Sequence, residues 1–190
     1  MSASPGGRSL HLGCGPTSKQ GDVGIDILPG AAVDIVHDLD VTPWPVDDDA
    51  FDRVICTDVL EHLRDVPAVM KEIYRVCSDG AVVEIQVPTG TSSDVFIDPT
   101  HLRGFSFRSF DYFDPSKPYY AYGYSSIRLH VEHYEFVAQP GRTFRLLDRA
   151  MERFAGRRSA FYEDRLCHLY PMRALRFRLV VSKQSAATGG

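Results

Sequence analysis

The sequence predicts an α/β fold whose seven-stranded sheet is mostly parallel, has helices on both faces and ends in an antiparallel strand. The first half alternates short apolar runs, bounded by Gly, Pro or Asp, with helical patterns, as strand–helix–strand units do. The second half holds two longer segments in which apolar and polar residues alternate, the pattern of strands with one face in water. The expected strands are 9–12, 23–27, 33–36, 53–56, 81–87, 126–137 and 175–181.

The helices are predicted from the spacing of apolar residues. Val66, Val69 and Ile73 recur at helical spacing, so a helix is expected over 66–76. A turn at Gly80 is expected to stop it and lead into the next strand. Two further helices are expected, one from about residue 142, with the basic stripe Arg142, Arg145, Arg149 and Arg153, and one over 161–169.

The length of 190 residues suits one domain with a substantial buried core. We expect a single domain over 1–184, made of parts 8–88, 89–126 and 127–184, and a disordered tail at 185–190. No apolar run approaches the roughly 20 residues that span a bilayer, and the first residues lack the apolar core of a signal peptide. A cytoplasmic protein without a membrane partner is therefore expected.

Charge and metal-ligating residues bear on the partners. The net charge is -4, whereas binding to nucleic acid needs a surplus of Lys and Arg, so no nucleic-acid partner is expected. The four cysteines are scattered without a CxxC pair, so neither disulfides nor a zinc knuckle is indicated. His130 and His133 fall on opposite faces of their expected strand by period-2 alternation, and no metal is expected.

Glycines and acids at three successive strand ends indicate one ligand site. The first strand ends in Gly13-Cys14-Gly15, where the backbone can approach a ligand without interference from Cβ atoms. Asp26 ends the second strand, where an acid can accept both ribose hydroxyls of an adenosine, and Asp38 follows the third. The carboxyl ends of parallel strands share one edge of the sheet, which is where open α/β folds bind ligands. Each acid also fits a simpler role in a turn or a solvated loop.

These segments resemble the class I S-adenosylmethionine-dependent methyltransferases, whose fold is Rossmann-like. The similarity is strongest to small bacterial members with a short crossover after the first strand, and the order and spacing of the motifs make it specific. The matching text is LHLGCG (10–15), GDVGIDI (21–27), VDIVHDLD (33–40), DDDAFDRVICTDVLEHL (47–63) and KEIYRVCSDGAVVEIQVP (71–88).

The resemblance implies that 8–88 bind S-adenosylmethionine as cofactor. The glycines of the first turn would approach its methionine part, Asp26 would hold the ribose, and Asp38 with the Leu39 amide would meet the adenine. Thr57 and Asp58 would lie beneath the sulfonium, and the element Glu61-His62-Leu63 would border the site. The full set of implied cofactor-binding residues is Leu12, Gly13, Cys14, Gly15, Asp26, Ile27, Asp38, Leu39, Thr57, Asp58 and His62.

Two departures from the family pattern affect these expectations. Only ten residues separate Gly15 from Asp26, so the crossover between the first two strands is minimal. Ser18 stands where a dinucleotide fingerprint has its third glycine, which weakens a nicotinamide-dependent reductase as an alternative. The first strand also begins close to the start of the sequence. Cover for the acceptor is therefore expected from 88–126 or from a partner chain, and a homodimer is compatible with the sequence.

His101 is the expected catalytic base. Methyl transfer from a sulfonium is an in-line displacement, so the protein chiefly positions the acceptor and removes its proton. His101 lies in the text DPTHLR after the fifth strand, where many relatives carry a similar Asp, His and Arg cluster. A histidine that only anchors its loop is the alternative. The aromatic segment 89–126 is expected to be the wall or lid of the acceptor site, or else a small accessory core.

The expected acceptor is a small or carbohydrate-like molecule that is methylated at oxygen. Small relatives of this layout are frequently linked to sugar, surface-polysaccharide or natural-product biosynthesis, and methylation at nitrogen, carbon or carboxylate stays open. The arginine stripe at 142–153 fits either an anionic acceptor or the wet face of a helix. A function from another class is also open, namely a non-catalytic S-adenosylmethionine-binding partner subunit of another methyltransferase.

Overall fold

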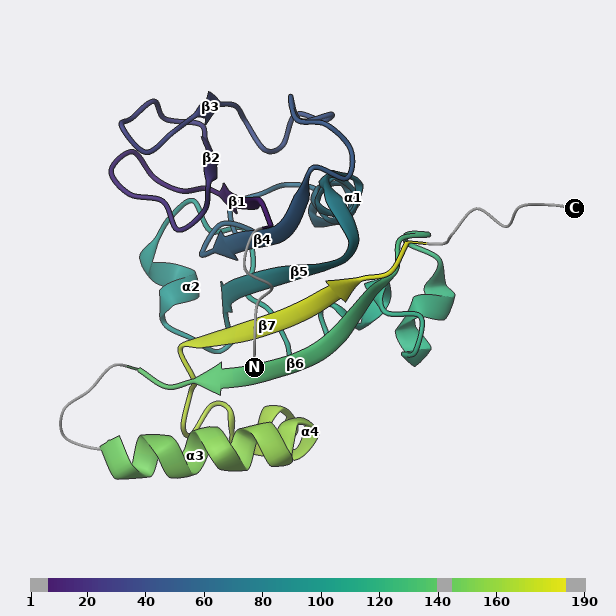
Figure 1. Ribbon diagram of the computed structural model, residues 1–190. Coiled ribbons are helices and arrows are strands. Elements are labelled where there is room, and N and C mark those ends of the chain that lie inside the picture. The colour runs from purple at the N-terminus through teal and green to yellow at the C-terminus, as the bar shows by residue number, and fades with distance from the viewer. Residues whose placement is uncertain (1–6, 140–144, 184–190) are drawn as a thin grey trace, which may run out of the picture.

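The computed structural model describes residues 7–139 and 145–183, and at its centre lies a seven-stranded sheet (Figure 1). The strand order is β3-β2-β1-β4-β5-β7-β6. The first five strands pair in parallel, whereas β7 is antiparallel to both β5 and β6. The predicted α/β fold with an antiparallel last strand is confirmed. The strands are β1 (Ser9–Leu12), β2 (Val23–Asp26), β3 (Ile35–Val36), β4 (Phe51–Thr57), β5 (Cys77–Pro88), β6 (Leu129–Val137) and β7 (Ala174–Val181).

One long helix lies between β4 and β5, and shorter helical segments follow β5. The helix α1 has the bounds that the apolar spacing predicts, because the Asp65 side chain caps it by accepting a hydrogen bond from the Ala68 amide at 2.9 Å. None of the helices within 7–139 and 145–183 has the length and apolar character needed to cross a membrane. The helical elements are α1 (Val66–Val76), α2 (Asp94–Ile97), η1 (Asp111–Phe113), η2 (Pro118–Tyr122), α3 (Arg145–Arg157), α4 (Ser159–Phe161) and the π-helical turn η3 (Tyr162–Leu166).

One face of the sheet is apolar and forms the core. Leu12, Cys56, Ile85 and Phe177 stand side by side across β1, β4, β5 and β7, each at most 3% exposed. The apolar side of α1 joins the same cluster of buried residues, which extends to Val181 at the end of β7. All four cysteines are buried and unpaired, as the absence of a CxxC pair indicates.

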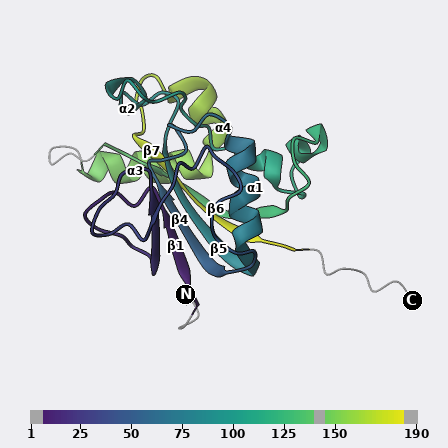
Figure 2. The same cartoon turned by 90° about the horizontal axis from the view of Figure 1, so that it is seen from above.

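The opposite face of the sheet is polar and carries a ladder of charged side chains. Glu84 on β5 pairs with Arg53 on β4 at 2.5 Å and with Arg178 on β7 at 3.3 Å, and Arg178 also pairs with Glu132 of β6. The helices are distributed unevenly around the sheet, with α1 behind it and α3 beside the β6 edge (Figures 1 and 2). One face of the sheet therefore packs against the core, and the other face carries charged side chains.

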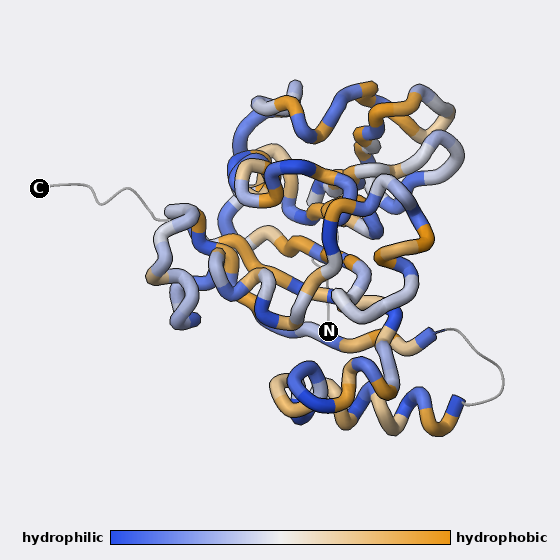
Figure 3. Tube along the Cα trace, turned by 180° about the vertical axis from the view of Figure 1, so that it is seen from behind, coloured by the Kyte–Doolittle hydropathy of each residue, from blue (hydrophilic) through white to orange (hydrophobic). Residues whose placement is uncertain are grey.

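Several elements differ in detail from the prediction. Strand β3 has only two residues, and β5 begins directly at Cys77, so the expected turn at Gly80 lies inside the strand as an irregularity with φ +77°. The helix expected over 161–169 is instead the short α4 followed by a π-helical turn. In Figure 3, α3 alternates hydrophobic and hydrophilic segments along its length. The beginning of the basic stripe at Arg142 and the tail 185–190 lie outside the described residues.

Candidate active site at the carboxyl ends of the strands

The glycine turn after β1 has the backbone geometry that the sequence predicts. Gly13 and Gly15 adopt φ of +60° and +70°, a region in which residues with a Cβ atom are strained. A Cβ on Gly13 would overlap the side chain of Val59, which comes from the turn after β4. A Cβ on Gly15 would meet nothing within 4 Å. The turn therefore packs closely on one side and leaves open space on the other.

Asp26, at the end of β2, is tied directly to this turn. One of its carboxylate oxygens accepts a hydrogen bond from the Gly15 amide at 2.8 Å, and the other accepts one from the Leu28 amide at 2.9 Å. Each carboxylate oxygen has a second lone pair, so both can still accept a ligand hydroxyl. The glycine turn and the acid at the end of β2 therefore lie next to each other.

Beyond Asp26 the chain after β2 and β3 carries exposed apolar side chains. Asp38 is exposed and uses one carboxylate oxygen to accept a bond from the Asp40 amide, whereas the Leu39 side chain is 5% exposed and belongs to the core. Only the backbone of Leu39 can therefore meet a ligand, and the same holds for the buried Leu12 and Cys14. Ile27 is predicted from the sequence as a site residue, whereas its apolar neighbours are not. A signal for them is the presence of apolar residues just after strands, where polar residues are more usual. The exposed set is Ile27, Leu28, Val36 and Val41.

The end of β4 contributes a strained residue. Asp58 adopts φ +53°, which is uncommon for a residue other than glycine. Its amide donates to the Gln86 carbonyl at 2.9 Å, and its carboxylate accepts a bond from the Gln86 side chain at 3.0 Å. Strand β5 therefore holds the β4 turn in place. Thr57, the last residue of β4, is half-buried beside the same residue of β5.

Glu61 follows this turn and is buried. Its side chain is 1% exposed, and its Oε2 atom has no hydrogen-bond partner within the described part of the chain. Burial raises the pKa of Glu61 to about 7, with smaller contributions from the charges of Asp58 and Asp98. A carboxylate in this state is unusual among structural residues, because buried polar atoms are normally paired. The sequence analysis placed Glu61 at the border of the site without a chemical role.

The loop after β5 brings His101 against Glu61. The Leu102 amide donates to the Glu61 carbonyl at 2.8 Å, which docks the loop onto the β4 turn. His101 Nε2 lies 3.9 Å from Glu61 Oε1, and its side chain is 11% exposed. The rings of His62 and His101 meet edge-on, with centroids 4.5 Å apart. Residues from two separate strand ends, Glu61, His62 and His101, thus form one cluster, which we call the Glu61–His62–His101 cluster.

Hydrogen bonds fix the tautomers of both histidines. His101 Nδ1 lies 2.9 Å from the Asp94 carbonyl, which can only accept, so Nδ1 carries the proton. The Thr100 hydroxyl donates to Asp98 at 2.7 Å and therefore accepts from His62 Nδ1 at 2.8 Å. In the neutral form both rings accordingly keep a free lone pair at Nε2.

The aromatic segment does not stay at this edge as one lid. Its first part does, because Gly90 and Phe105 are bonded next to the end of β5. The second part runs to the opposite end of the sheet, where Asp114 accepts a bond from the Val131 amide near the start of β6. The single substrate-side loop expected over 89–126 is thus wrong for its second half, as the right of Figure 1 shows. The tyrosines that gather there are Tyr112, Tyr119, Tyr122 and Tyr124.

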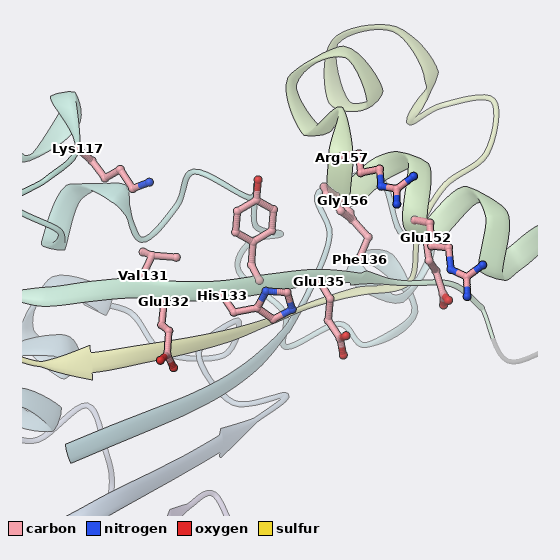
Figure 4. A pocket seen from close by; sticks show the side chains of 11 residues that line it. Lys117, Val131, Glu132, His133, Glu135, Phe136, Glu152, Gly156 and Arg157 are labelled. Atoms are coloured by element: carbon pink, nitrogen blue, oxygen red, sulfur yellow. The ribbon is translucent and has the colours of Figure 1, made fainter. Parts of the chain in front are cut away.

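The arginines of α3 lie at another place again. A groove of about 620 Å³ follows the outer edge of β6 and is lined by Arg153 and Arg157 of α3 and by Lys117 (Figure 4). Strand β6 stands at the opposite end of the strand order from β1 and β2. Arg145 and Arg149 are exposed on the same helix. The described part of the basic stripe is therefore remote from the glycine turn, and the simpler interpretation as a wet helix face fits it better.

His130 and His133 point to the same face of β6, and not to opposite faces as period-2 alternation predicts. A bulge at Glu132 shifts the register, so His130 is opposite Val180 and His133 is opposite Arg178, two residues of the same face of β7. His130 is engaged by Asp114 at 3.1 Å. The group of metal-ligating side chains that the described residues do bring together is the Glu61–His62–His101 cluster.

Comparisons with known proteins agree with this arrangement. A family model described as a methyltransferase domain matches residues 5–178. No protein of curated function matches the sequence. Among solved structures, a SAM-dependent methyltransferase of Archaeoglobus fulgidus is 17% identical with a TM-score of 0.54, the matched region covering 91% of this chain and 85% of that one.

Two other solved structures share the fold. The YcgJ protein of Bacillus subtilis is 12% identical with a TM-score of 0.55, covering 94% of this chain and 93% of its own. The [4+2]-cyclase SpnF is 16% identical with a TM-score of 0.53, covering 94% of this chain and 76% of its own. At these identities the structures show the fold, and the family rests on the match over 5–178. The chain belongs to this methyltransferase domain family and is a class I S-adenosylmethionine-dependent methyltransferase.

Proposed function

We propose that the protein methylates a hydroxyl oxygen of a small or carbohydrate-like acceptor, with the donor bound at the glycine turn and the acceptor beside His101. The observation that carries the proposal is the Glu61–His62–His101 cluster, which stands next to the donor turn because Val59 of the same β4 turn packs against Gly13. Donor and acceptor sites must adjoin for an in-line transfer of a methyl group.

The methyl donor would be bound by the residues that the sequence indicates, some of them through backbone atoms alone. The ribose would be held by Asp26 and the methionine part by the open side of Gly15. The adenine would lie on the exposed apolar side chains after β2 and β3, near Asp38. Three buried residues are proposed to bind the cofactor through backbone atoms alone, namely Leu12, Cys14 and Leu39. The other proposed cofactor-binding residues are Gly13, Gly15, Asp26, Ile27, Asp38, Thr57, Asp58 and His62.

An oxygen acceptor is supported by the state of His101. A hydroxyl must lose its proton during transfer, whereas a neutral amine can attack first and lose its proton afterwards. The Asp94 carbonyl keeps the proton of His101 on Nδ1, which leaves Nε2 as the proton acceptor. A histidine is suited to this task near neutral pH.

The surface next to His101 supports a compact acceptor with an apolar side. Phe96 and Ile97 of α2 are 80% and 73% exposed, and Leu102, which follows the histidine, is 54% exposed. Sugars and many small metabolites combine an apolar face with hydroxyl groups, and aromatic rings recognise such faces. We further propose that the enzyme acts in the cytoplasm in small-molecule tailoring as part of biosynthesis.

The test is a screen for methyl transfer from labelled S-adenosylmethionine to sugars and small metabolites, with two variants. His101→Ala should lower turnover of a verified acceptor about a hundredfold or more and leave the affinity for S-adenosylhomocysteine unchanged. His133→Ala, which removes an exposed histidine of β6, should behave like the wild type. Unchanged turnover of His101→Ala would remove this histidine from the mechanism.

The same screen addresses the second functional class. A non-catalytic partner subunit would bind S-adenosylhomocysteine but transfer no methyl group to any acceptor in the panel. Methyl transfer would then be seen only when this chain is mixed with its catalytic partner chain. Size-exclusion chromatography with light scattering reports in the same samples whether the chain forms a homodimer.

A further inference from the structure

We propose that Glu61, His62 and His101 hold a divalent transition-metal ion, of the kind represented by Zn²⁺ or Mn²⁺, at the boundary between the donor and acceptor sites. One oxygen of Glu61 and one nitrogen of each histidine lie within 4.8 Å of one another. Donors bound tetrahedrally at about 2.1 Å from one ion are about 3.4 Å apart, so the three donor atoms need to approach one another by up to about 1.4 Å.

The buried carboxylate is the first observation that indicates a cation. Glu61 is 1% exposed, and its Oε2 has no partner among the described residues. An unpaired buried carboxylate is costly, and a bound cation is one of the few groups that offset the cost. Within the described parts of the chain, neither Glu61 nor its acidic neighbours Asp58 and Asp98 form an ion pair with Lys or Arg. Apart from the two histidines of the cluster, the described residues therefore supply no cationic side chain to these three acids.

The second observation is the way in which both imidazoles are held. Metal-ligating histidines donate their other ring N–H to a carbonyl, a carboxylate or a comparable acceptor, which fixes the ring and its tautomer. His101 does so to the Asp94 carbonyl and His62 to Thr100, whose hydroxyl is in turn held by Asp98. Both Nε2 lone pairs are therefore free for an ion.

The donor set indicates the kind of ion. Two imidazole nitrogens and one carboxylate suit Zn²⁺, Mn²⁺, Fe²⁺ or Co²⁺, whereas Mg²⁺ and Ca²⁺ prefer sites made of oxygen alone. Three protein ligands leave at least one position for an exogenous molecule. His62 is half-buried and Thr100 is exposed, so that position can be reached from solvent.

The inference deepens the proposed function and rests on it for its chemical meaning. An acceptor hydroxyl bound to the ion would have a lowered pKa, as metal-bound water does, and would be methylated as an alkoxide. Its proton would pass to solvent water or buffer, the oxygen–methyl bond would form, and the sulfonium–methyl bond would break with its electron pair on sulfur. His101 would then act as a ligand of the ion and not as the direct proton acceptor.

The experiment titrates tag-free, chelator-treated protein with Co²⁺ and Zn²⁺, following the visible absorption of Co²⁺ and its displacement by Zn²⁺. We expect one ion per chain, and a loss of affinity above about a hundredfold in Glu61→Gln and His101→Ala. Thr100→Val removes only the acceptor that orients His62 and should weaken binding about 10- to 100-fold. His133→Ala is the matched control and should bind as the wild type does, and circular dichroism confirms that each variant is folded.

Stoichiometric binding that Glu61→Gln, His101→Ala and Thr100→Val leave unchanged would overturn the inference, as would the absence of binding to the wild type. The two proposals fail separately. Methyl transfer that needs His101 but survives complete chelation leaves the proposed function intact and removes the metal. Metal binding at the cluster without methyl transfer to any acceptor leaves the metal site intact and removes the proposed function.

Discussion

Gly15 of the glycine turn and Gly80 of β5 form a matched pair of residues for a test of the donor site. Both have positive φ, +70° and +77°, and a Cβ on either would meet nothing within 4 Å. Gly15→Ala and Gly80→Ala should therefore lose a similar stability, about 1 kcal/mol, from backbone strain. Only Gly15→Ala should also weaken binding of S-adenosylhomocysteine, roughly tenfold or more, because its methyl group enters the proposed ligand space. Thermal melting and calorimetry measure the two effects, and equal affinities of the two variants would contradict this placement of the ligand.

Gly13→Ala should differ from both variants. Its Cβ would overlap Val59, so steric overlap adds to the strain of φ +60°. We expect a loss of stability of about 2–3 kcal/mol, larger than that of Gly80→Ala. Urea unfolding checks the difference, and a second variant, Gly13→Ala with Val59→Ala, should recover part of it. A loss no larger than that of Gly80→Ala would show that the β4 turn does not pack on the glycine turn.

At this scale the sequence predicts contacts between neighbouring strand ends better than contacts between residues far apart in the chain. The contact of Gly15 with Asp26 follows from two adjacent parallel strand ends and could be anticipated. The role of Glu61 could not, because its burial depends on a loop 41 residues later in the chain, whose Leu102 amide bonds to the Glu61 carbonyl. No local pattern contains that contact.

Asp114 bonds the segment before β6 to the start of that strand. Its carboxylate is 2% exposed and accepts bonds from the Val131 amide at 2.9 Å, from Ser116 and from His130 at 3.1 Å. Burial alone would raise the pKa of Asp114, but the bonds from Val131 and Ser116 and the nearby His130 lower it below its ordinary value. A carboxylate with a depressed pKa stabilises the fold above its unfolded pKa of about 3.9 and loses that contribution as the pH falls through its folded pKa.

Asp114→Asn should therefore lower stability near pH 7 by about 1.5–3 kcal/mol and make the loss of stability between about pH 5 and 3 less steep. Urea unfolding at several pH values measures both effects. Asp47→Asn, at an exposed site, is the control and should leave the profile unchanged. A profile for Asp114→Asn parallel to that of the wild type would show that this carboxyl does not hold the segment before β6.

Element boundaries were predictable where their signals are local. The bounds of α1 follow from its apolar spacing and the Asp65 cap. Long-range contacts decided the other cases. The bulge at Glu132 puts His133 on the other face of β6, and no Gly or Pro in the sequence indicates this bulge. The segment with the tyrosines after Asp111 lies beside β6 because Asp114 bonds to that strand, although an aromatic composition also fits the wall of a ligand site.

At the scale of the whole molecule, one core connects α1 with the strands of the sheet in the described residues, whereas α2 and η2 contribute no buried residue to it. The buried cluster runs from Leu10 in β1 through Trp44 to Val181 in β7. We therefore predict one cooperative unfolding transition, since a single core leaves no part to unfold alone. Trp44 is the only tryptophan and is 2% exposed, so its fluorescence reports on the N-terminal half of the chain, while far-ultraviolet circular dichroism reports on all elements. Coincident midpoints are expected, and two separate midpoints would divide the domain.

In the proposed function, the donor binds at the glycine turn and Asp26, and the acceptor binds at the Glu61–His62–His101 cluster. The most direct measurement is calorimetric titration of S-adenosylhomocysteine into the wild type, Asp26→Asn and His101→Ala. We predict one site per chain in the wild type, an affinity about tenfold lower in Asp26→Asn, since bonds to a charged group are the stronger ones, and wild-type affinity in His101→Ala. Absence of binding to the wild type, or equal affinity of the wild type and Asp26→Asn, would contradict it.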